Sequence, residues 1–434
     1  MTRKEVLAGM FWKISFRARR NTHTRRASKD KDEGKASNIG SMSELPLAIL
    51  MDILSRLPIK TILECKCVCR TWFNLVSDPY FAQMHLARAP VSILLLTNLQ
   101  QRSTYSGDFL VPLLRSNRIG NLSADRLSLL TSCNGLLCLH DLGYKKDEIS
   151  VCNPFLREHM VLPQVRSKRI LRRIIGFGIT QSTNQYKLIQ ILNSKNQAEN
   201  SDKFQVEIFT LGTDMWRNNG FLPYQLIQPS YGAFSHGALH WYAHSHDKKT
   251  LMCSFDLENE QFQPFPGPPI QDHGQCRPVN SISVGVSGDF LYLCDGFRES
   301  NIDIWVMKNY GEKGSWTKEF SVANPLVSKL QRIFGSIHIL NYGLNMNMSE
   351  RATEDAEILM LFGSEEVLAY KVRSKGVRKP RTFSIQSNYQ AIPYTASLVS
   401  IKDAVMEVRP RVKHSPRGLL HTSNLVSIQS IHPT

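Results

Sequence analysis

The feature that most constrains the fold of this sequence is a pair of short strands that recurs along most of the chain. Each copy has a strand, a turn, a second strand with alternating apolar residues, and then a Trp or Phe. The five copies are EISVCNPFLREHMVLP, QVEIFTLGTDMWRN, LMCSFDLENEQFQPF, DIWVMKNYGEKGSWTKEF and VLAYKVRSKGVRKPRTF, with Ile149, Val206, Met252, Ile302 and Val367 as markers. The markers lie 46 to 65 residues apart. Repeats of about 50 residues, each mostly strand, predict a kelch-like β-propeller, and the irregular spacing leaves a β-sandwich open as the alternative.

Residues 43–88 have a different character and predict a small helical module ahead of the all-β region. Ser43 and Pro46 are residues that open a helix, and the apolar stretch that follows stops at Pro58. Thr61-Ile62-Leu63-Glu64 matches a capping box and predicts the start of a second helix. Asp78-Pro79 predicts the start of a third. The fold class is therefore α+β multidomain, with a short all-α module followed by an all-β domain.

The predicted helices are apolar around most of their circumference. A module of about 45 residues has too small a core to bury that much apolar surface by itself. Either a partner protein or the β domain of the same chain covers the surplus. Helical periodicity does not choose between these two interpretations.

Three cysteines at alternate positions, Cys65, Cys67 and Cys69, raise the question of a metal site. On one helix Cys67 is rotated by about 200° from Cys65, so the three thiols cannot converge on one ion. We expect them to pack as small hydrophobic side chains, with Cys65 and Cys69 continuing an apolar stripe from Ile62 to Trp72. Nine cysteines without a CxxC pair indicate a reducing compartment, so we expect the nucleus, the cytoplasm or both.

The net charge of +16 is concentrated in two segments. Residues 1–35 carry a net charge of +7 and residues 371–417 carry +9, so the remaining residues are balanced. Basic segments of this kind are either solvated, disordered ends or binding sites for nucleic acid, and we do not expect a nucleic-acid partner. No apolar run approaches the roughly 20 residues that span a bilayer, and VLAGMFW is followed by Lys13 and several arginines rather than by a cleavage site, so we expect neither a membrane nor a secretory signal.

These observations divide the chain into five predicted regions. They are a basic disordered extension (1–41), the helical module (43–88), a linker with first strands (91–129), the β domain (130–401) and a basic C-terminal tail (402–434).

Catalytic and metal-binding patterns fail when they are examined in detail. The segment HGALHWYAHSH places four histidines, His236, His240, His244 and His246, on one face if it is a strand, but it lacks the glutamate of a zinc-protease helix. GVSGD at 285–289 does not match G-x-S-x-G, and GFG at 176–178 lacks the rest of a phosphate-binding loop. We therefore expect no catalytic residue, no metal and no cofactor.

One basic cluster lies within the predicted β domain, at Arg166, Lys168, Arg169, Arg172 and Arg173. It predicts a solvated loop between blades. Arg172 and Arg173 are nevertheless our candidates for contact with an acidic or phosphorylated target.

The segment LPLAILMDILSRLPIKTILECKCVCRTWFNLVSDPYFAQMHL closely resembles an F-box, the adaptor-binding module of cullin–RING ubiquitin ligases. The matching features are Leu45-Pro46, Leu57-Pro58, Val68-Cys69-Arg70, Trp72 and Ser77-Asp78-Pro79. The resemblance implies that the surplus apolar surface binds a Skp-type adaptor. The candidate contacts, some of which must belong to the core of the module, are Leu45, Pro46, Leu50, Ile53, Leu54, Leu57, Pro58, Leu63, Val68 and Trp72.

The region 130–401 resembles the F-box-associated interaction domain of the large plant F-box family. The matching pieces, in order, are SCNGLLCL, NPFLRE, IIGFGITQSTNQYKLIQI, VEIFTLGTDMWR, HGALHWYA, CSFDLENEQF, IWVMKNYGEKGSWTKEF and YTASLVSI. The resemblance implies a non-catalytic substrate receptor of an SCF-type (Skp–cullin–F-box) E3 ubiquitin ligase, which captures an unidentified protein for ubiquitination and degradation. A non-degradative binding scaffold and a basic-tailed nucleic-acid binder are the alternatives.

Overall fold

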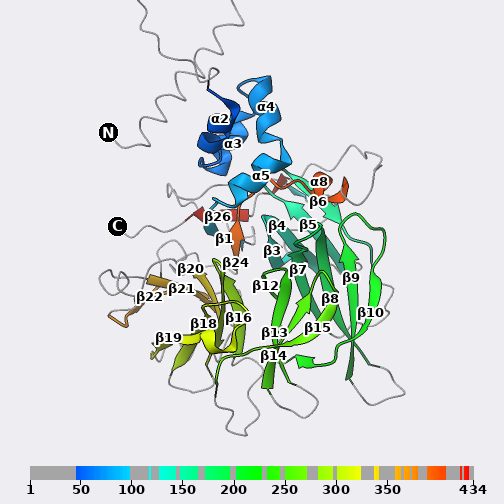
Figure 1. Cartoon of the computed structure of the whole chain (residues 1–434), viewed down its shortest axis with the longest axis vertical. Coiled ribbons are helices and arrows are strands. Elements are labelled where there is room, and N and C mark those ends of the chain that lie inside the picture. The colour runs from blue at the N-terminus through cyan, green and yellow to red at the C-terminus, as the bar shows by residue number, and fades with distance from the viewer. Residues whose placement is uncertain are drawn as a thin grey trace, which may run out of the picture. The chain divides into compact units, whose positions relative to one another are not determined.

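The computed structural model divides the chain into two compact units, residues 1–89 and 90–434 (Figure 1). The basic segment 1–41, predicted to be disordered, lies outside the described residues. Among the helices that the structure describes, none combines the length and hydropathy needed to cross a bilayer. The described residues are 45–97, 117–118, 127–142, 147–164, 172–195, 202–226, 232–244, 250–270, 282–296, 301–323, 337–341, 357–362, 366–371, 374–379, 389–406, 421–422 and 425–429.

The first unit contains four short helices: α2 (Leu47–Leu54), α3 (Ile59–Cys65), α4 (Arg70–Val76) and α5 (Pro79–Leu86). The predicted start of the last helix is confirmed, because the Asp78 side chain accepts a hydrogen bond from the Tyr80 amide at 2.8 Å and Pro79 takes the first helical position. The predicted second helix is wrong in its bounds. It begins after Pro58 rather than at Thr61, and a turn separates it from α4.

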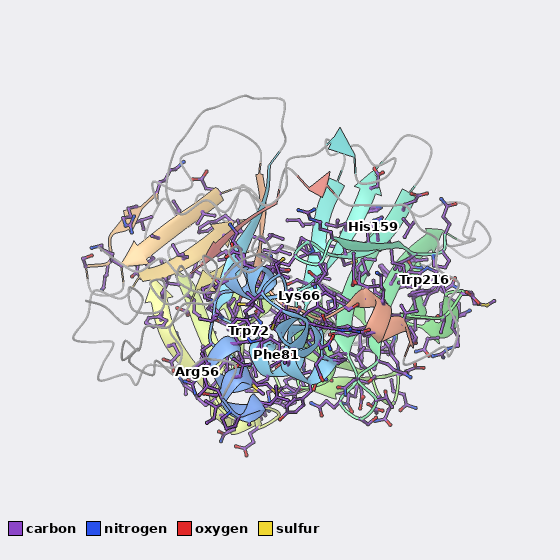
Figure 2. All side chains as sticks on the ribbon, turned by 90° about the horizontal axis from the view of Figure 1, so that it is seen from above. Arg56, Lys66, Trp72, Phe81, His159 and Trp216 are labelled. Atoms are coloured by element: carbon purple, nitrogen blue, oxygen red, sulfur yellow. The ribbon has the colours of Figure 1, made fainter. Side chains whose placement is uncertain are left out.

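The helical unit has a core of its own. Side chains from all four helices are buried, and they include Leu54, Ile62, Trp72 and Phe81. Figure 2 shows Trp72 and Phe81 among the helices.

The second unit is a five-bladed β-propeller, which confirms the predicted propeller and removes the sandwich alternative. Every blade is an antiparallel sheet, and consecutive sheets follow one another along the chain (Figure 1). The first blade contains β3 (Leu127–Cys133), β4 (Leu136–Leu142), β5 (Asp147–Asn153) and β6 (Glu158–Val161), and the second contains β7 (Arg172–Ile179), β8 (Tyr186–Lys195), β9 (Asp202–Thr210) and β10 (Arg217–Phe221). The third contains β11 (Gln225–Leu226), β12 (Ala233–Ser235), β13 (Ala238–His244), β14 (Thr250–Asp256) and β15 (Gln261–Phe265). The fourth contains β16 (Ile282–Ser287), β17 (Phe290–Asp295), β18 (Ile302–Met307) and β19 (Trp316–Val322), and the fifth contains β20 (Ile337–Asn341), β21 (Glu357–Phe362), β22 (Glu366–Lys371) and β23 (Val377–Arg378).

Each of the five repeated sequence segments corresponds to one pair of adjacent strands in one blade. They form the two outer strands of successive blades, β5–β6, β9–β10, β14–β15, β18–β19 and β22–β23. The inner strands β3, β7, β12, β16 and β20 contact the inner strands of neighbouring blades. The sequence pattern therefore marked the outer half of every blade.

The ring is completed by a three-stranded sheet that has no copy of the repeat. Its central strand β1 (Val91–Thr97) pairs with β24 (Tyr389–Thr395) on one side and with β26 (Leu425–Gln429) on the other. Strand β24 contacts β3 of the first blade and β20 of the last. A ring of blades is thus closed by strands from both ends of the unit.

The segments on either side of the predicted β domain also contribute elements to this unit. The region 91–129, predicted as a linker with first strands, supplies β1 and also β2 (Asn117–Arg118), which pairs with β25 (His421–Thr422). The predicted tail 402–434 supplies β25, β26 and most of α8 (Ile401–Met406), a helix that buries Ile401 and Ala404 against the first two blades.

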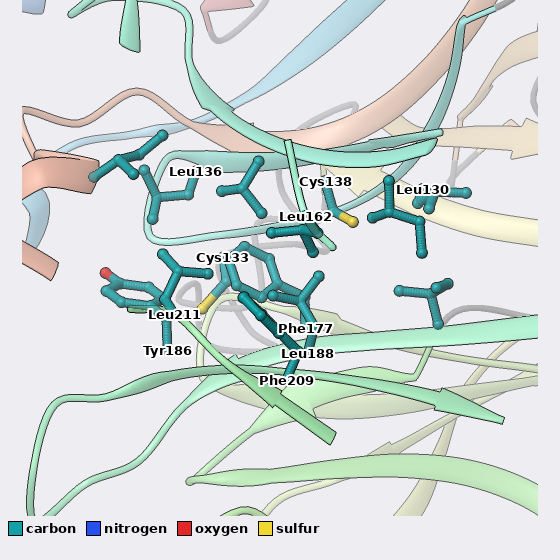
Figure 3. Close-up of a cluster of buried hydrophobic side chains, with 14 of the residues drawn as sticks. Leu130, Cys133, Leu136, Cys138, Leu162, Phe177, Tyr186, Leu188, Phe209 and Leu211 are labelled. Atoms are coloured by element: carbon teal, nitrogen blue, oxygen red, sulfur yellow. The ribbon is translucent and has the colours of Figure 1, made fainter. Parts of the chain in front are cut away.

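Successive blades bury apolar clusters between them. Figure 3 shows the cluster between the first two blades, where Cys133 and Cys138 pack beside Phe177, Tyr186 and Phe209 as small apolar groups. The glycines of GFG, Gly176 and Gly178, allow the second blade to approach the third. A Cβ on Gly178 would lie 2.4 Å from the Phe234 ring of the third blade, so the blades approach too closely for any side chain there.

A side chain at or immediately before the start of an outermost strand repeatedly bonds to the preceding blade. Trp216 Nε1 donates to the Pro163 carbonyl at 2.8 Å, and Trp316 Nε1 donates to the Pro266 carbonyl at 2.9 Å. In two copies of the sequence repeat, the Trp therefore forms a hydrogen bond that joins neighbouring blades, which we call the latch.

A glutamate takes this place at two other junctions. Glu260 pairs with Lys187 at 2.9 Å and with Arg217 at 2.5 Å, both on the second blade. Glu158 accepts hydrogen bonds from the Ser400 hydroxyl and the Ile401 amide, which follow the closing strand β24.

Candidate functional site

The ten predicted adaptor contacts fall into three groups in the structure. Leu50, Leu54 and Trp72 are buried, so the structure assigns these three to the core of the helical unit. Leu45, Pro46 and Pro58 are exposed. The remaining four are half-buried, namely Ile53, Leu57, Leu63 and Val68.

Four apolar side chains outside the predicted set are more exposed than any of these leucines. The exposed fractions are 56% for Leu47, 48% for Ile49, 51% for Phe73 and 66% for Tyr80. Sequence position could have indicated Phe73, because it follows the buried Trp72 and is therefore rotated by about 100° around α4. The sequence gives no such indication that Leu47 is exposed while Leu50 and Leu54 are buried, because all three lie within the same wide apolar arc of the helix.

The three cysteines lie at the junction of α3 and α4, and they do not share one helix. Cys65 is buried in the last turn of α3, whereas Cys67 and Cys69 are exposed, with Cys69 at the N-cap of α4. The predicted stripe from Cys65 through Cys69 to Trp72 is therefore wrong, because a turn interrupts it. Burial raises the pKa of the Cys65 thiol to about 12, and a metal ligand must be a thiolate. Within the described ranges, no group of three His, Cys, Asp or Glu residues is placed to hold a metal ion.

The predicted histidine face is divided between a turn and a strand. His236 lies in the β12–β13 turn, His240 and His244 lie in β13, and His246 lies outside the described residues. His240 Nδ1 is 3.0 Å from the Ala233 carbonyl, which can only accept, so Nδ1 carries the proton. Nε2 must then accept from the Tyr310 hydroxyl at 2.9 Å. Burial lowers the pKa of His240 to about 4, so this ring is a neutral structural group.

The predicted basic loop is placed only in part. Residues 165–171 lie outside the described residues, and Arg172 and Arg173 begin strand β7. Both arginines are thus the first residues of a strand and do not lie in the loop predicted for them. Their role in target binding stays a prediction.

A small pocket lies at one end of the third and fourth blades. It has a volume of about 130 Å³. Its lining includes His236 of the β12–β13 turn, Asp289 of the β16–β17 turn and Leu291 of β17, together with Met307 at the end of β18 and Tyr310 of the β18–β19 connection. No sequence pattern indicated it, because its lining comes from three separate segments.

Comparison with known proteins assigns both units. Residues 42–83 match the F-box domain model, and residues 105–401 match the model described as F-box associated beta propeller domain. The F-box protein At3g07870 of Arabidopsis thaliana is 30% identical over 365 residues, which cover 76% of this chain and 86% of that protein. The F-box protein CPR1 of the same plant is 25% identical, with 82% and 89% of the two chains covered. The F-box/kelch-repeat protein At3g23880 of Arabidopsis thaliana is also 25% identical, with 65% and 80% covered.

The second of these models spans more than half of the chain, and the fold of the corresponding residues is the one that the model describes. The chain therefore belongs to the family of plant F-box proteins that carry an F-box-associated β-propeller domain.

Proposed function

We propose that this protein is the substrate-recognition subunit of an SCF-type E3 ubiquitin ligase. The F-box docks on a Skp-type adaptor and through it on a cullin–RING ligase, and the propeller captures a protein target for ubiquitination and degradation. Such a subunit is not an enzyme, because it acts by raising the effective concentration of the target near the transferase. We place this activity in the nucleus, the cytoplasm or both.

The observation that carries the proposal is the exposed apolar surface of the F-box. Leu47, Ile49, Phe73 and Tyr80 stay about half exposed or more although the unit buries a core of its own. Burying apolar surface at an interface contributes about 25 cal/mol per Å². Exposed aromatic and branched side chains on a small folded unit are typical of a protein-binding surface.

Capture of the adaptor by the full chain tests this docking. We expect Ile49→Asp and Phe73→Asp to abolish capture, because each places a charge where an apolar contact is needed. Gln83→Asp on α5 is the matched control, since Gln83 is exposed and polar, and it should leave capture unchanged. The double change Leu45→Ala with Pro46→Ala should also abolish capture. Retained capture in all of these variants would overturn the docking.

A second measurement separates degradation from scaffolding. The Ile49→Asp variant keeps its propeller and should hold a target without delivering it to the ligase. Mass spectrometry of its bound proteins should reveal a partner that also accumulates with the wild-type chain when the proteasome is inhibited. A partner whose level does not respond to the inhibitor would favour the non-degradative scaffold.

A further inference from the structure

The pocket between the third and fourth blades has walls that are fixed before any ligand arrives. The Tyr310 hydroxyl donates to His240, which is itself held by the Ala233 carbonyl. The His236 ring stacks on Tyr310 with centroids 4.0 Å apart and an interplanar angle of 15°. A binding surface held in this way loses little conformational entropy when it is occupied.

The floor of the pocket is apolar. Leu291 and Met307 are buried side chains of adjacent strands, and Phe290 lies beside them. A volume of about 130 Å³ accepts one side chain rather than a folded element.

The charges at the rim leave one carboxylate uncompensated. Lys308 pairs with Glu319 at 2.5 Å, and its ammonium lies 5.9 Å from the centroid of the Phe290 ring. Asp289 is exposed in the β16–β17 turn, and no described residue forms an ion pair or hydrogen bond with its carboxylate. The Lys308–Glu319 pair is neutral as a unit, so the rim favours a cationic ligand.

We propose that this pocket receives an arginine side chain of the protein target. The aliphatic part of the side chain packs on Leu291 and Met307. The planar guanidinium pairs with the Asp289 carboxylate and lies against the His236–Tyr310 stack. Arginine suits such a site better than lysine, because a guanidinium pairs with a carboxylate through two parallel hydrogen bonds and stacks on aromatic rings. The inference rests on the proposed function, since it names the chemistry by which the propeller recognises its target.

Selection from a random hexapeptide library displayed on phage tests the proposal with the full chain as bait. We expect the wild-type protein to enrich peptides with arginine at one fixed position. For the best selected peptide, Asp289→Asn should weaken binding about tenfold, which corresponds to about 1.4 kcal/mol. Asp403→Asn is the control, because Asp403 is an exposed carboxylate on α8 outside the pocket, and it should leave the affinity unchanged.

Each other outcome overturns the proposal. Enrichment of an apolar, aromatic or acidic residue would show that a different side chain fills the pocket. Equal binding by Asp289→Asn, or no selected peptide at all, would show that the pocket recognises no arginine. Capture of the adaptor is measured on the same preparations. Failure of the pocket with intact adaptor capture refutes this inference alone, whereas loss of adaptor capture by the wild-type chain refutes the proposed function.

Discussion

Replacing Asn153 should open the propeller at its closure. This residue is the last one of β5 in the first blade, and its side chain is fully buried. Its amide nitrogen donates to the carbonyls of Ser397 at 3.1 Å and Val399 at 2.7 Å, just after the closing strand β24. Its amide oxygen accepts from the backbone of Phe155 at 2.9 Å and Leu156 at 3.2 Å. One side chain therefore satisfies four backbone groups and joins segments about 245 residues apart.

The expected cost follows from these four bonds. Each hydrogen bond contributes about 0.5–1.5 kcal/mol net, and a buried group left without a partner costs about 1–3 kcal/mol. Asn153→Ala should therefore lower the free energy of unfolding by about 3–4 kcal/mol. Asn153→Asp should cost at least as much although it has the same shape, because it directs a carboxylate oxygen at two carbonyl oxygens. Asn218→Ala is the comparison. Asn218 is exposed and accepts one hydrogen bond from the Gly220 amide, so its loss should cost less than about 1 kcal/mol.

Urea unfolding of the full chain, followed by tryptophan fluorescence, measures these differences. Four of the six tryptophans, Trp216, Trp241, Trp305 and Trp316, lie in the propeller, so the signal reports mainly on this unit. With a slope of about 3 kcal/mol per M, the midpoint for Asn153→Ala should fall by about 1 M. A midpoint shift no larger than that of Asn218→Ala would refute the role assigned to Asn153.

Three further predictions concern the same unit. Trp216→Phe should lower the free energy of unfolding by about 1 kcal/mol in the same assay, because the Pro163 carbonyl loses its donor, and no change would exclude the latch. Gly135→Ala should cost more than about 2 kcal/mol, since Gly135 has φ +80° and an added Cβ would lie 2.2 Å from Ser397 Oγ; a soluble variant with unchanged thermal unfolding would contradict this. Burial tends to raise the pKa of Glu260, but hydrogen bonds from Arg217 and Lys187 hold it below its ordinary value. Its contribution to stability is therefore present above the unfolded pKa of about 4.5 and is lost as the pH falls through the folded pKa; Glu260→Gln should flatten the acid side of the stability profile, and an unchanged profile would be evidence against the pairing.

The outer half of each blade could be predicted from the sequence because its signal is local. Two strands, a turn and a Trp or Phe fall within one short segment. In two blades the Trp of this segment, Trp216 or Trp316, bonds to the preceding blade, so the residue type at this position has a structural reason. The inner strands vary more. β12 has three residues and β20 has five, and the closing sheet contains no copy of the repeat. The positions of the inner strands and of the closing sheet depend on contacts between segments far apart in the sequence. The periodicity of apolar residues within one segment does not predict such contacts.

The F-box shows a different limit of sequence reasoning. Prolines and an N-cap, which act locally, predict the boundaries of the unit and the start of α5. The division of its apolar residues between core and surface depends on where α3 stops. Because the chain turns after Cys65, Trp72 is buried while Cys69 and Phe73 are exposed. No single-helix projection across residues 62–73 could have produced that division.

Closure of the ring has a consequence for how the propeller can be isolated. The family match covers residues 105–401, yet the closing sheet also uses β1 at 91–97 and β26 at 425–429. A fragment cut to 105–401 keeps β24 but removes both of the other strands, so β24 would be left as an unpaired apolar edge, a recognised source of aggregation. We expect this fragment to aggregate at concentrations at which residues 90–434 stay monomeric, as measured by light scattering. Only four residues separate the end of α5 at Leu86 from the start of β1 at Val91. The strand that follows the F-box is therefore the central strand of the closing sheet, and an F-box deletion preserves the propeller only if it ends before Val91.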